Sequence, residues 1–397
     1  MQRKLAFALF VSVLSAFLPS VLNTGVVRSH AAERESRVMP PSTGVPASRL
    51  ARLRRGINLS HWFAQSPRRD YSETHLKTHT TERDIALIKS LGFDHVRFTI
   101  EPAPLMDESA ATRLKPAYLV QLDAALDMLL ASGLAVVVDI HPSDEFKIRL
   151  RTDDRAVAAF NDFWRALARH LSTRDAERLF LEILNEPMVE DAYRWIGIQA
   201  RVAAAIREAA PRHTIIATGA RWSSIDQLLL LEPLADRNVI YNFHFYEPHN
   251  FTHQGATWGA DFWPHLKGLP YPSSPELVSG LVPTVENQAA QAALKHYGDE
   301  RWDAVRVDKE IALAVAWARK HNVPLVCNEF GVYRTFAPET ARLRWIEDVR
   351  TALERHGIGW AMWDYAGGFS VVIKKDGSTT PDARTVAALG LRPRPSR

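Results

Sequence analysis

The chain has 397 residues, of which 46% are hydrophobic and 24% charged, a composition typical of a soluble globular protein. Its formal net charge is +4, and the basic residues are spread along the chain, which argues against a nucleic-acid footprint because such footprints are clustered. The single cysteine, Cys327, excludes an intramolecular disulfide and any metal site built from several cysteines.

The amino-terminal residues have the features of an export signal. Arg3 and Lys4 precede an apolar run, 5–18, which is shorter than the roughly 20 residues of a membrane span. A small-x-small cleavage site ends at Ala31, so residues 1–31 predict a signal peptide and an exported, periplasmic or extracellular protein. The apolar run lies far from this cleavage site, so an alternative is that the segment stays uncleaved and anchors the protein. We expect a stable association with a membrane only in that case.

The remainder of the chain divides into a linker and one domain. Residues 32–50 are rich in Pro, Ser and charge, and they predict a flexible linker. Over residues 51–397, apolar strand-like runs alternate with helical patterns, so we expect a single folded domain there.

Local signals support this alternation. Thr81 and Asp84 have capping-box spacing at the start of one helix, and Gly92 closes it. One strand-like run is continuous and Val-rich, as expected for a parallel strand buried on both faces. The predicted strands cover 53–59, 95–100, 134–140, 179–184, 213–218, 239–246, 323–328 and 358–362, and the predicted helices begin near residues 80, 116, 156, 192, 303, 338 and 383.

Eight strands mostly separated by helices predict an α/β fold, a closed (β/α)8 barrel. An open doubly wound sheet is the alternative, but no Gly-rich phosphate turn follows the first strand. The alternation breaks after the sixth strand, where residues 247–300, rich in Pro, Gly, Trp and His, form a long insertion. Near the carboxyl end, Asp376-Gly377 predicts a hairpin turn and 383–389 a last short helix.

Polar side chains lie at the ends of the predicted strands. In a parallel barrel these ends share one face, so residues far apart in sequence converge on one cleft. Each residue alone has an ordinary structural explanation, such as an ion pair or core packing, but the joint pattern does not. The residues are Arg97 in the second strand, His141 after the third, Asn185 and Glu186 after the fourth, His244 and Tyr246 in the sixth, Glu329 after the seventh and Trp363 after the eighth.

Two of these residues, Glu186 and Glu329, are carboxylates placed on opposite sides of the barrel mouth. This arrangement suits glycosidic-bond cleavage, in which one carboxylic acid protonates the leaving oxygen and the other carboxylate attacks the anomeric carbon. A barrel can hold the pair about 5 Å apart, the separation of retaining enzymes. Arg97 and the Tyr246 hydroxyl would keep a nearby carboxylate ionised.

The ordered set of strand-end residues resembles glycoside hydrolase family 5, the cellulase family, within the larger clan of retaining (β/α)8 barrels. The resemblance covers about residues 55–365. It implies that Glu186 is the general acid/base, that Glu329 is the nucleophile of a double displacement, and that no metal or other cofactor takes part. Spacing alone does not decide which glutamate has which role. The family also implies that Arg97 and Tyr246 attend Glu329, while His141, Asn185, His244 and Trp363 shape the subsite of the attacked sugar.

Three further tryptophans are candidates for stacking on sugars. Trp62 and Trp222 are expected in the loops after the first and fifth strands, and Trp258 lies in the insertion. The insertion either covers the cleft and limits the length of bound chain, or is a surface excursion packed against the barrel. A cover would turn an open endo-acting cleft into an exo-acting pocket, or favour transfer to another sugar.

These observations predict an exported retaining β-glycosidase that hydrolyses an oligo- or polysaccharide, most simply an endo-β-1,4-glucanase. An exo-β-glucosidase, a mannanase and a transglycosylase acting on cell-envelope β-glucan are alternatives within the class. A metal-dependent barrel hydrolase using His141, His244 and Glu329 is less favoured because no His-x-His pair follows the first strand. A non-catalytic sugar-binding protein is also less favoured, because binding alone does not need two opposed carboxylates.

Overall fold

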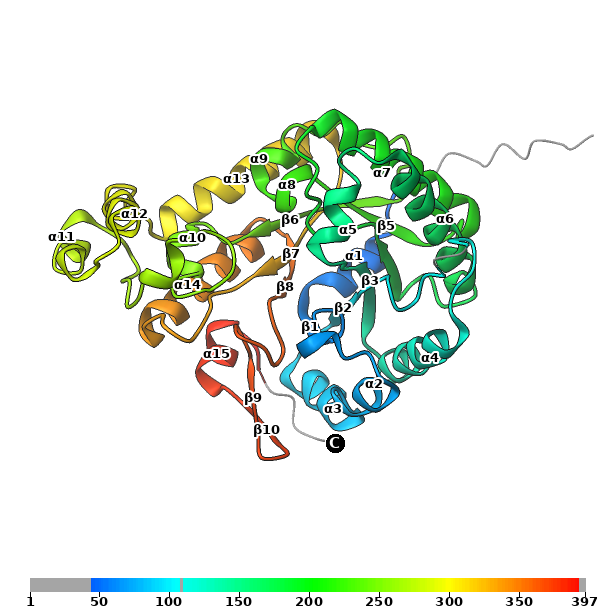
Figure 1. The fold of residues 1–397 in the computed structure, drawn as a ribbon, viewed down its shortest axis with the longest axis horizontal. Coiled ribbons are helices and arrows are strands. Elements are labelled where there is room, and N and C mark those ends of the chain that lie inside the picture. The colour runs from blue at the N-terminus through cyan, green and yellow to red at the C-terminus, as the bar shows by residue number, and fades with distance from the viewer. Residues whose placement is uncertain (1–43, 108–109, 393–397) are drawn as a thin grey trace, which may run out of the picture. The chain divides into compact units, whose positions relative to one another are not determined.

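The computed structural model describes residues 44–107 and 110–392. Its eight main strands pair in parallel in the order β1 to β8, and β8 pairs with β1 to close a barrel (Figure 1). The predicted (β/α)8 barrel is therefore confirmed. The predicted signal peptide and most of the predicted linker lie outside the described residues. None of the helices in the described part of the chain combines the length and the apolarity that a membrane crossing requires.

Each barrel strand coincides with one predicted run. The first prediction is the least accurate, because Leu53 lies in a 3-10 turn and the strand continues past Leu59 to Phe63. The strands are β1 Arg55–Phe63, β2 His95–Ile100, β3 Ala135–Ile140, β4 Leu179–Glu182, β5 Thr214–Thr218, β6 Val239–Phe245, β7 Leu325–Phe330 and β8 Gly359–Met362.

Helices surround the barrel, and local signals determine where several of them begin and end. The Thr81–Asp84 capping box is present at the start of α3, and Gly92 ends that helix in the left-handed region at φ 96°. The large helices are α3 Glu82–Leu91, α4 Pro116–Ala131, α6 Asp154–Leu171, α7 Ala192–Ala209, α13 Ala304–His321 and α14 Glu339–Arg355.

Shorter elements connect these helices to the strands. Asp376 and Gly377 form the predicted hairpin turn between β9 Val372–Lys375 and β10 Ser378–Pro381. The short helices are α1 Ala47–Leu50, α2 Glu73–Thr78, α5 Asp144–Arg149, α8 Ala220–Ser223, α9 Ile225–Leu228, α10 His249–Thr252, α11 Pro275–Val278 and α15 Ala383–Ala388, with 3-10 turns at Ala51–Leu53, Pro67–Arg69, Trp263–His265 and Val282–Thr284. The insertion also contains a longer helix, α12 Gln288–Asp299.

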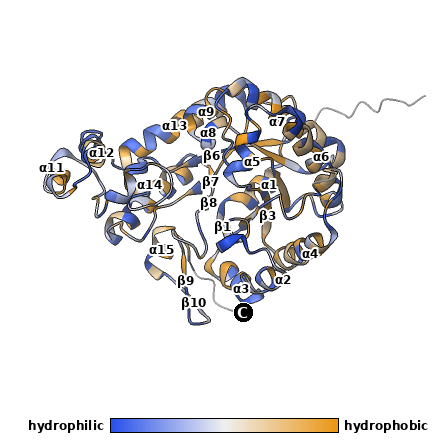
Figure 2. Ribbon diagram, viewed as in Figure 1, coloured by the Kyte–Doolittle hydropathy of each residue, from blue (hydrophilic) through white to orange (hydrophobic). Residues whose placement is uncertain are grey.

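The interior of the barrel changes from apolar to polar along the strands. Because side chains alternate across a strand, residues two positions apart point the same way. Val137 and Phe180 belong to an apolar cluster inside the barrel, and two residues further on the same strands carry the buried carboxylates Asp139 and Glu182. Outside the barrel, a much larger apolar cluster packs the strands against helices that show both orange and blue faces in Figure 2.

Residues 44–50, the described part of the predicted linker, belong to the fold. Val45 and Leu50 pack against the apolar cluster inside the barrel. Arg49 is buried, and its Nη1 donates to the Arg212 carbonyl at 2.7 Å and to Thr214 Oγ1 at 3.0 Å. The linker prediction is therefore wrong for residues 44–50, because their apolar side chains close the amino-terminal end of the barrel.

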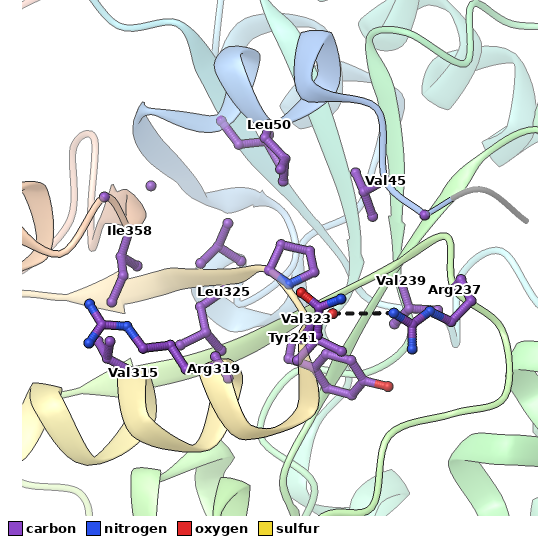
Figure 3. A pocket seen from close by; sticks show the side chains of 18 of the residues that line it. Val45, Leu50, Arg237, Val239, Tyr241, Val315, Arg319, Val323, Leu325 and Ile358 are labelled. Carbon is purple, nitrogen blue, oxygen red and sulfur yellow. Dashed lines mark hydrogen bonds between the residues drawn. The ribbon is translucent and has the colours of Figure 1, made fainter.

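This end of the barrel contains a cavity of about 530 Å³, bordered by Val45, Leu50 and the beginning of β7 (Figure 3). Arg237 at its rim donates to the Asn322 carbonyl at 3.4 Å. None of the residues predicted for the site borders this cavity. The predicted site residues therefore lie away from this cavity, toward the carboxyl ends of the strands.

The chain between β6 and α13 forms the predicted insertion. Its α10 lies near the barrel, whereas α11 and α12 lie far out at the left of Figure 1. The Tyr271 hydroxyl donates to Asp348 of α14 at 2.9 Å, and the rings of Phe251 and Tyr297 stack at 10°. These contacts anchor the insertion to α14 and to its own first turn.

Candidate active site

A cleft of about 1140 Å³ opens where the carboxyl ends of the strands meet. Convergence of the strand-end residues is thus confirmed, although their chemical roles stay predictions. The predicted residues that line the cleft are His141, Asn185, Glu186, Trp222, His244, Tyr246, Trp258, Glu329 and Trp363.

Arg97 does not line this cleft. It is fully buried beneath it, and its Nη1 donates to Glu329 Oε1 at 2.5 Å. The Tyr246 hydroxyl donates to Glu329 Oε2 at 3.0 Å, so each carboxylate oxygen of Glu329 accepts a hydrogen bond. Arg97 therefore supports Glu329, as predicted, but it is misplaced among the residues that contact a ligand.

Sequence reasoning missed the other carboxylates around Arg97. Glu182 accepts from Arg97 Nε and Nη2, both at 2.9 Å, and Asp139 Oδ2 lies 3.1 Å from Nη2. The Nδ2 atoms of Asn242 and Asn328 also donate to Glu182, at 3.2 and 2.7 Å. The available signal was a charged residue inside an otherwise apolar strand, which requires a buried partner.

A bulge explains why Glu329 lies beside His244. The pairing of β6 with β7 shifts after Cys327, so that His244 pairs with Glu329 and Asn328 is an extra residue. Consecutive side chains on a regular strand point to opposite faces. Here the Asn328 side chain contacts Glu182 while that of Glu329 contacts Arg97, so both point into the barrel.

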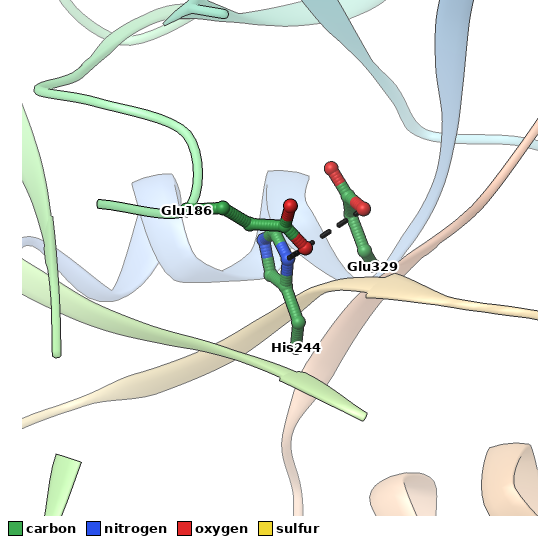
Figure 4. Close-up of side chains that lie close together, drawn as sticks. All are labelled: Glu186, His244 and Glu329. Carbon is green, nitrogen blue, oxygen red and sulfur yellow. Dashed lines mark hydrogen bonds and ion pairs between the residues drawn. The ribbon is translucent and has the colours of Figure 1, made fainter. Parts of the chain in front are cut away.

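Glu186 also departs from regular strand geometry. Its φ of 43° is in the left-handed region, which costs a non-glycine residue about 1 kcal/mol. With this turn, Asn185 contacts Arg97 while Glu186 Oε1 lies 3.0 Å from His244 Nδ1. The same nitrogen is 3.5 Å from Glu329 Oε2 (Figure 4), and carboxylate oxygens of the two glutamates lie within 4.8 Å of each other.

Burial shifts the proton affinities of this group. Burial raises the pKa of Glu329 to about 7, and the charges of Glu186 and Asp139 add to this effect, while His244 and Arg97 oppose it. Burial likewise raises the pKa of Asp139 to about 7. Burial lowers the pKa of His244 to about 4, so its imidazole is neutral at pH 7. Burial disfavours a charged Arg97, but its three carboxylate neighbours raise its pKa well above the usual value.

Aromatic side chains form the floor and one side of the cleft. The Trp363 ring stacks on His141 at 5.5 Å and 18°. Trp222 and Trp258 are 49% and 48% exposed, which leaves flat faces free for a ligand. Trp222 is the middle residue of three with left-handed φ, and its N–H donates to the Pro187 carbonyl at 3.1 Å, which ties its loop to the turn after Glu186.

The prediction for Trp62 is wrong. Trp62 belongs to β1 rather than to a loop, and it is only 1% exposed. Its Nε1 donates to the Leu76 carbonyl at 2.6 Å, and its ring packs edge-on against Phe63 at 5.0 Å. The strand extends further than its pattern suggested, so Trp62 is a core residue outside the cleft.

The insertion was predicted either to cover the cleft or to be a surface excursion, and each prediction holds for one part of it. Its first part, up to Trp263, lines the cleft through His249, His253 and Trp258. The His249 and His253 rings stack on Trp263 at 1° and 23°. Residues 264–300 do not line the cleft. A short wall thus comes from the insertion, while its remainder is a surface excursion.

Within the described ranges, one group of three side chains is close enough to share a metal ion: Glu186, His244 and Glu329. It is not the trio predicted for a metal-dependent hydrolase. Both ring nitrogens of His141 have other partners, since Nδ1 is 2.9 Å from Asp139 Oδ2 and Nε2 is 3.1 Å from Asn185 Nδ2.

Comparison with known proteins points to one family. The family model described as cellulase, glycosyl hydrolase family 5, matches residues 60–368. Endoglucanase C of Acetivibrio thermocellus is 30% identical over 323 residues, covering 80% of this chain and 92% of that protein. Cellodextrinase A of Ruminococcus flavefaciens is 27% identical, covering 77% of this chain and 83% of its own length.

Solved structures agree with this assignment. Endoglucanase Cel5A from the hyperthermophilic Thermotoga maritima superposes with a TM-score of 0.70 at 25% identity, covering 86% of this chain and 98% of that chain. The cellulose synthase subunit Z of Clostridioides difficile superposes with a TM-score of 0.69 at 26% identity, covering 85% and 99%.

Two substitutions should move the pKa of Glu329 in opposite directions. Tyr246→Phe removes a hydrogen bond to the charged carboxylate, so the pKa should rise by about one unit. Glu186→Gln removes a like charge, so the pKa should fall. Carbon-13 NMR titration of labelled glutamate carboxyl groups measures both shifts, with the Glu329→Gln spectrum identifying the resonance. Tyr333→Phe is the matched control, because Tyr333 packs against Trp258 and Phe369 and the contacts of Glu329 do not include it. An unchanged pKa in Tyr246→Phe would contradict the assigned hydrogen bond.

Proposed function

Because the chain belongs to glycosyl hydrolase family 5, the cellulase family, we propose that this glycoside hydrolase is an endo-β-1,4-glucanase that retains anomeric configuration. The relatives named endoglucanases, including endoglucanase 3 of Fibrobacter succinogenes at 28% identity, support the choice of bond. The approach of the two carboxylates, Glu186 and Glu329, to within 4.8 Å carries the choice of mechanism, since inverting enzymes hold them farther apart.

Glu186 and Glu329 divide the chemistry in two steps. In the first, a Glu329 oxygen attacks the anomeric carbon while protonated Glu186 gives its proton to the leaving glycosidic oxygen, and the bond between that oxygen and carbon breaks. In the second, Glu186 takes a proton from water, whose oxygen attacks the same carbon and displaces Glu329. Glu329 must therefore begin charged, and Glu186 must begin protonated.

The neighbouring side chains suit these proton states. Arg97 and the Tyr246 hydroxyl each donate to Glu329, which favours its charged form against the effect of burial. His244 Nδ1 lies 3.0 Å from Glu186 Oε1 and 3.5 Å from Glu329 Oε2, so the single proton of the neutral imidazole lies on Nδ1, facing the charged carboxylate. When Glu329 becomes esterified and Glu186 becomes charged, the pair keeps one negative charge in contact with His244.

The cleft walls suit a chain of pyranose sugars. Trp363, stacked on His141, offers an apolar face to the attacked sugar, and Asn185 lies beside it as a hydrogen-bonding group. Trp222 and Trp258 offer two further faces on the side of β5 and the insertion. Flat rings of this kind bind sugars through their apolar faces.

Two observations support alternatives within the class. The likeness to a protein named cellodextrinase A, together with the wall formed by His249, His253 and Trp258, favours an enzyme that acts on short chains, including exo-acting and transglycosylating forms. The solved Cel5A structures include complexes with cellobiose and with mannotriose, which keeps mannan among the candidate substrates.

Glu329→Gln should reduce hydrolysis of an aryl β-cellobioside on the order of 10⁴-fold, because the attacking carboxylate is lost. Glu186→Ala should spare the first step for a dinitrophenyl leaving group, which needs no proton, and added azide should give a β-glycosyl azide. Glu190→Gln, an exposed glutamate in the same loop, is the control. An α-configured azide product would refute retention, and activity lost in EDTA but restored by zinc would favour the metal-dependent alternative.

The pattern of products should distinguish endo-acting from exo-acting hydrolysis. On β-1,4-glucan the viscosity should fall early, because internal bonds are cut before short products accumulate. Product time courses on β-1,3-, β-1,4- and β-1,6-glucans and on mannan measure linkage and mode of attack together. Release of single sugars from one chain end would instead support the exo-acting alternative. Preferential cleavage of mannan would show that mannan, rather than β-1,4-glucan, is the substrate.

We also propose that the protein is exported. The basic and apolar features of residues 1–31 support this proposal. Cleavage after Ala31 should leave Ala32 as the first residue of the native protein, as measured by mass spectrometry of the periplasmic or secreted fraction. An intact amino terminus in the cytoplasmic fraction would contradict export, and an intact one in the membrane fraction would support the uncleaved anchor.

A further inference from the structure

Beneath the stacked Trp363, four buried side chains form a closed ring of polar contacts. Asp139 Oδ2 is 2.9 Å from His141 Nδ1, and His141 Nε2 is 3.1 Å from Asn185 Nδ2. Asn185 Oδ1 accepts from Arg97 Nη2 at 2.9 Å, and the same nitrogen is 3.1 Å from Asp139 Oδ2. Arg97 lies in β2 and Asp139 in β3, while His141 and Asn185 follow the ends of β3 and β4, and none of the four is more than 4% exposed.

The ring determines where the proton of His141 lies. Asp139 Oδ2 forms an ion pair with Arg97 Nη2 at 3.1 Å, and the adjacent positive charge disfavours a proton on that oxygen. Asp139 Oδ1 has no hydrogen-bond partner in the part of the chain that the structure describes, so a proton gained by this carboxyl group goes to Oδ1 and leaves Oδ2 an acceptor. His141 therefore carries its proton on Nδ1. Burial lowers the pKa of His141 well below its usual range, so the imidazole is neutral and Nε2 is a bare acceptor.

The acceptor at Nε2 orients the amide of Asn185. One N–H of Asn185 donates to His141, and its oxygen accepts from Arg97, so the amide is held at both ends. The second N–H is free to donate into the cleft that Asn185 lines. Asn185 immediately precedes Glu186, and it shares Arg97 with Glu329, so its amide is linked to both glutamates of the mechanism.

Asp139 is not needed simply to balance the charge of Arg97. Glu182 already accepts two hydrogen bonds from the guanidinium group, and Glu329 accepts a third. A third carboxylate in the same buried space adds repulsion, because Asp139 itself raises the pKa values of Glu182 and Glu329. A role toward His141 accounts for its presence better than a role toward Arg97.

We propose that Asp139 is a positioning residue: it holds His141 in the Nδ1–H form and thereby aims the Asn185 N–H at the 2-hydroxyl of the attacked sugar. The inference rests on the proposed function: Glu329 attacks the anomeric carbon, and Asn185 shares Arg97 with Glu329, so we assign its free N–H to the hydroxyl on the neighbouring carbon. Hydrogen bonds to the 2-hydroxyl strengthen in the transition state of such enzymes and contribute several kcal/mol. Asp139 acts through His141 and does not touch the sugar.

Two substitutions at Asp139 separate the hydrogen-bonding role from the charge. Asp139→Asn keeps an acceptor oxygen at the Oδ2 position and places its NH₂ group at the unpartnered Oδ1 position. Asp139→Ala removes the acceptor for His141 Nδ1–H, so the ring can carry its proton on Nε2 instead. An Nε2–H would face the N–H of Asn185, and the hydrogen bond between these residues would be lost. The two variants should therefore differ in how well they use the 2-hydroxyl.

The measurement is the ratio of kcat/KM for an aryl β-cellobioside to that for its analogue lacking the 2-hydroxyl on the attacked sugar. The wild type should show a ratio on the order of 10²-fold. Asp139→Asn should keep this ratio to within about threefold, and Asp139→Ala should lower it by at least about tenfold. General destabilisation would lower both rates equally, so an unchanged ratio in Asp139→Ala would overturn the proposal.

A second measurement needs no variant. Nitrogen-15 NMR of the histidine-labelled wild-type enzyme, with His141→Gln used for assignment, reports which ring nitrogen carries the proton. A proton on Nδ1 supports the proposal, and a proton on Nε2 overturns it. If neither glycoside is hydrolysed, the proposed function fails, while the tautomer still decides whether Asp139 positions His141.

Discussion

One buried arginine organises the carboxyl end of this barrel. Among the described residues, Arg97 is the single cation in direct contact with Asp139, Glu182 and Glu329, and full ionisation of all three carboxylates would leave two uncompensated negative charges out of water. Proton affinities therefore rise across the group, and hydrogen bonds decide which member stays charged. Glu182 is held by Arg97 and by two asparagine amides, which leaves Glu329 as the member that also faces the cleft. The position of Glu329 thus depends on a network that lies almost entirely below the surface.

Departures from regular strand geometry bring the reactive groups onto one face. A strand sends alternate side chains inward, so a motif of consecutive polar residues would normally place half of them outside the barrel. The bulge at Asn328 and the left-handed turn at Glu186 remove this restriction, each at a different strand end. They allow Asn328 and Asn185 to bind the network below while Glu329 and Glu186 face His244 above. The local conformational cost is offset by hydrogen bonds and ion pairs that regular strands could not make.

Binding surface and reactive group come from different parts of the chain. The reactive group lies on strands and strand ends inside a fully packed barrel, whereas the aromatic side of the cleft comes from the β5 loop and the first part of the insertion. Loops tolerate change more readily than a buried charged network does. Under the proposed function, changes at Trp222, Trp258 and their neighbours would alter which sugar chain is bound, while Arg97 and its partners keep the reactive group the same.

The sequence by itself determined the barrel, the order of its strands, and the identity of the polar residues that end them, because hydrophobic periodicity and capping signals act locally. It also determined that Glu186 and Glu329 meet, since parallel strands all end on one face. Tertiary structure alone decided the rest. Trp62 is buried because β1 continues past Leu59, where its sequence pattern ends. Residues 44–50 are ordered because Val45 and Leu50 cover the apolar cluster at the amino-terminal end of the barrel. The partners of Arg97, the tautomer of His141 and the pairing of His244 with Glu329 arise between strands far apart in the chain, where burial and register, rather than any local pattern, determine the contacts.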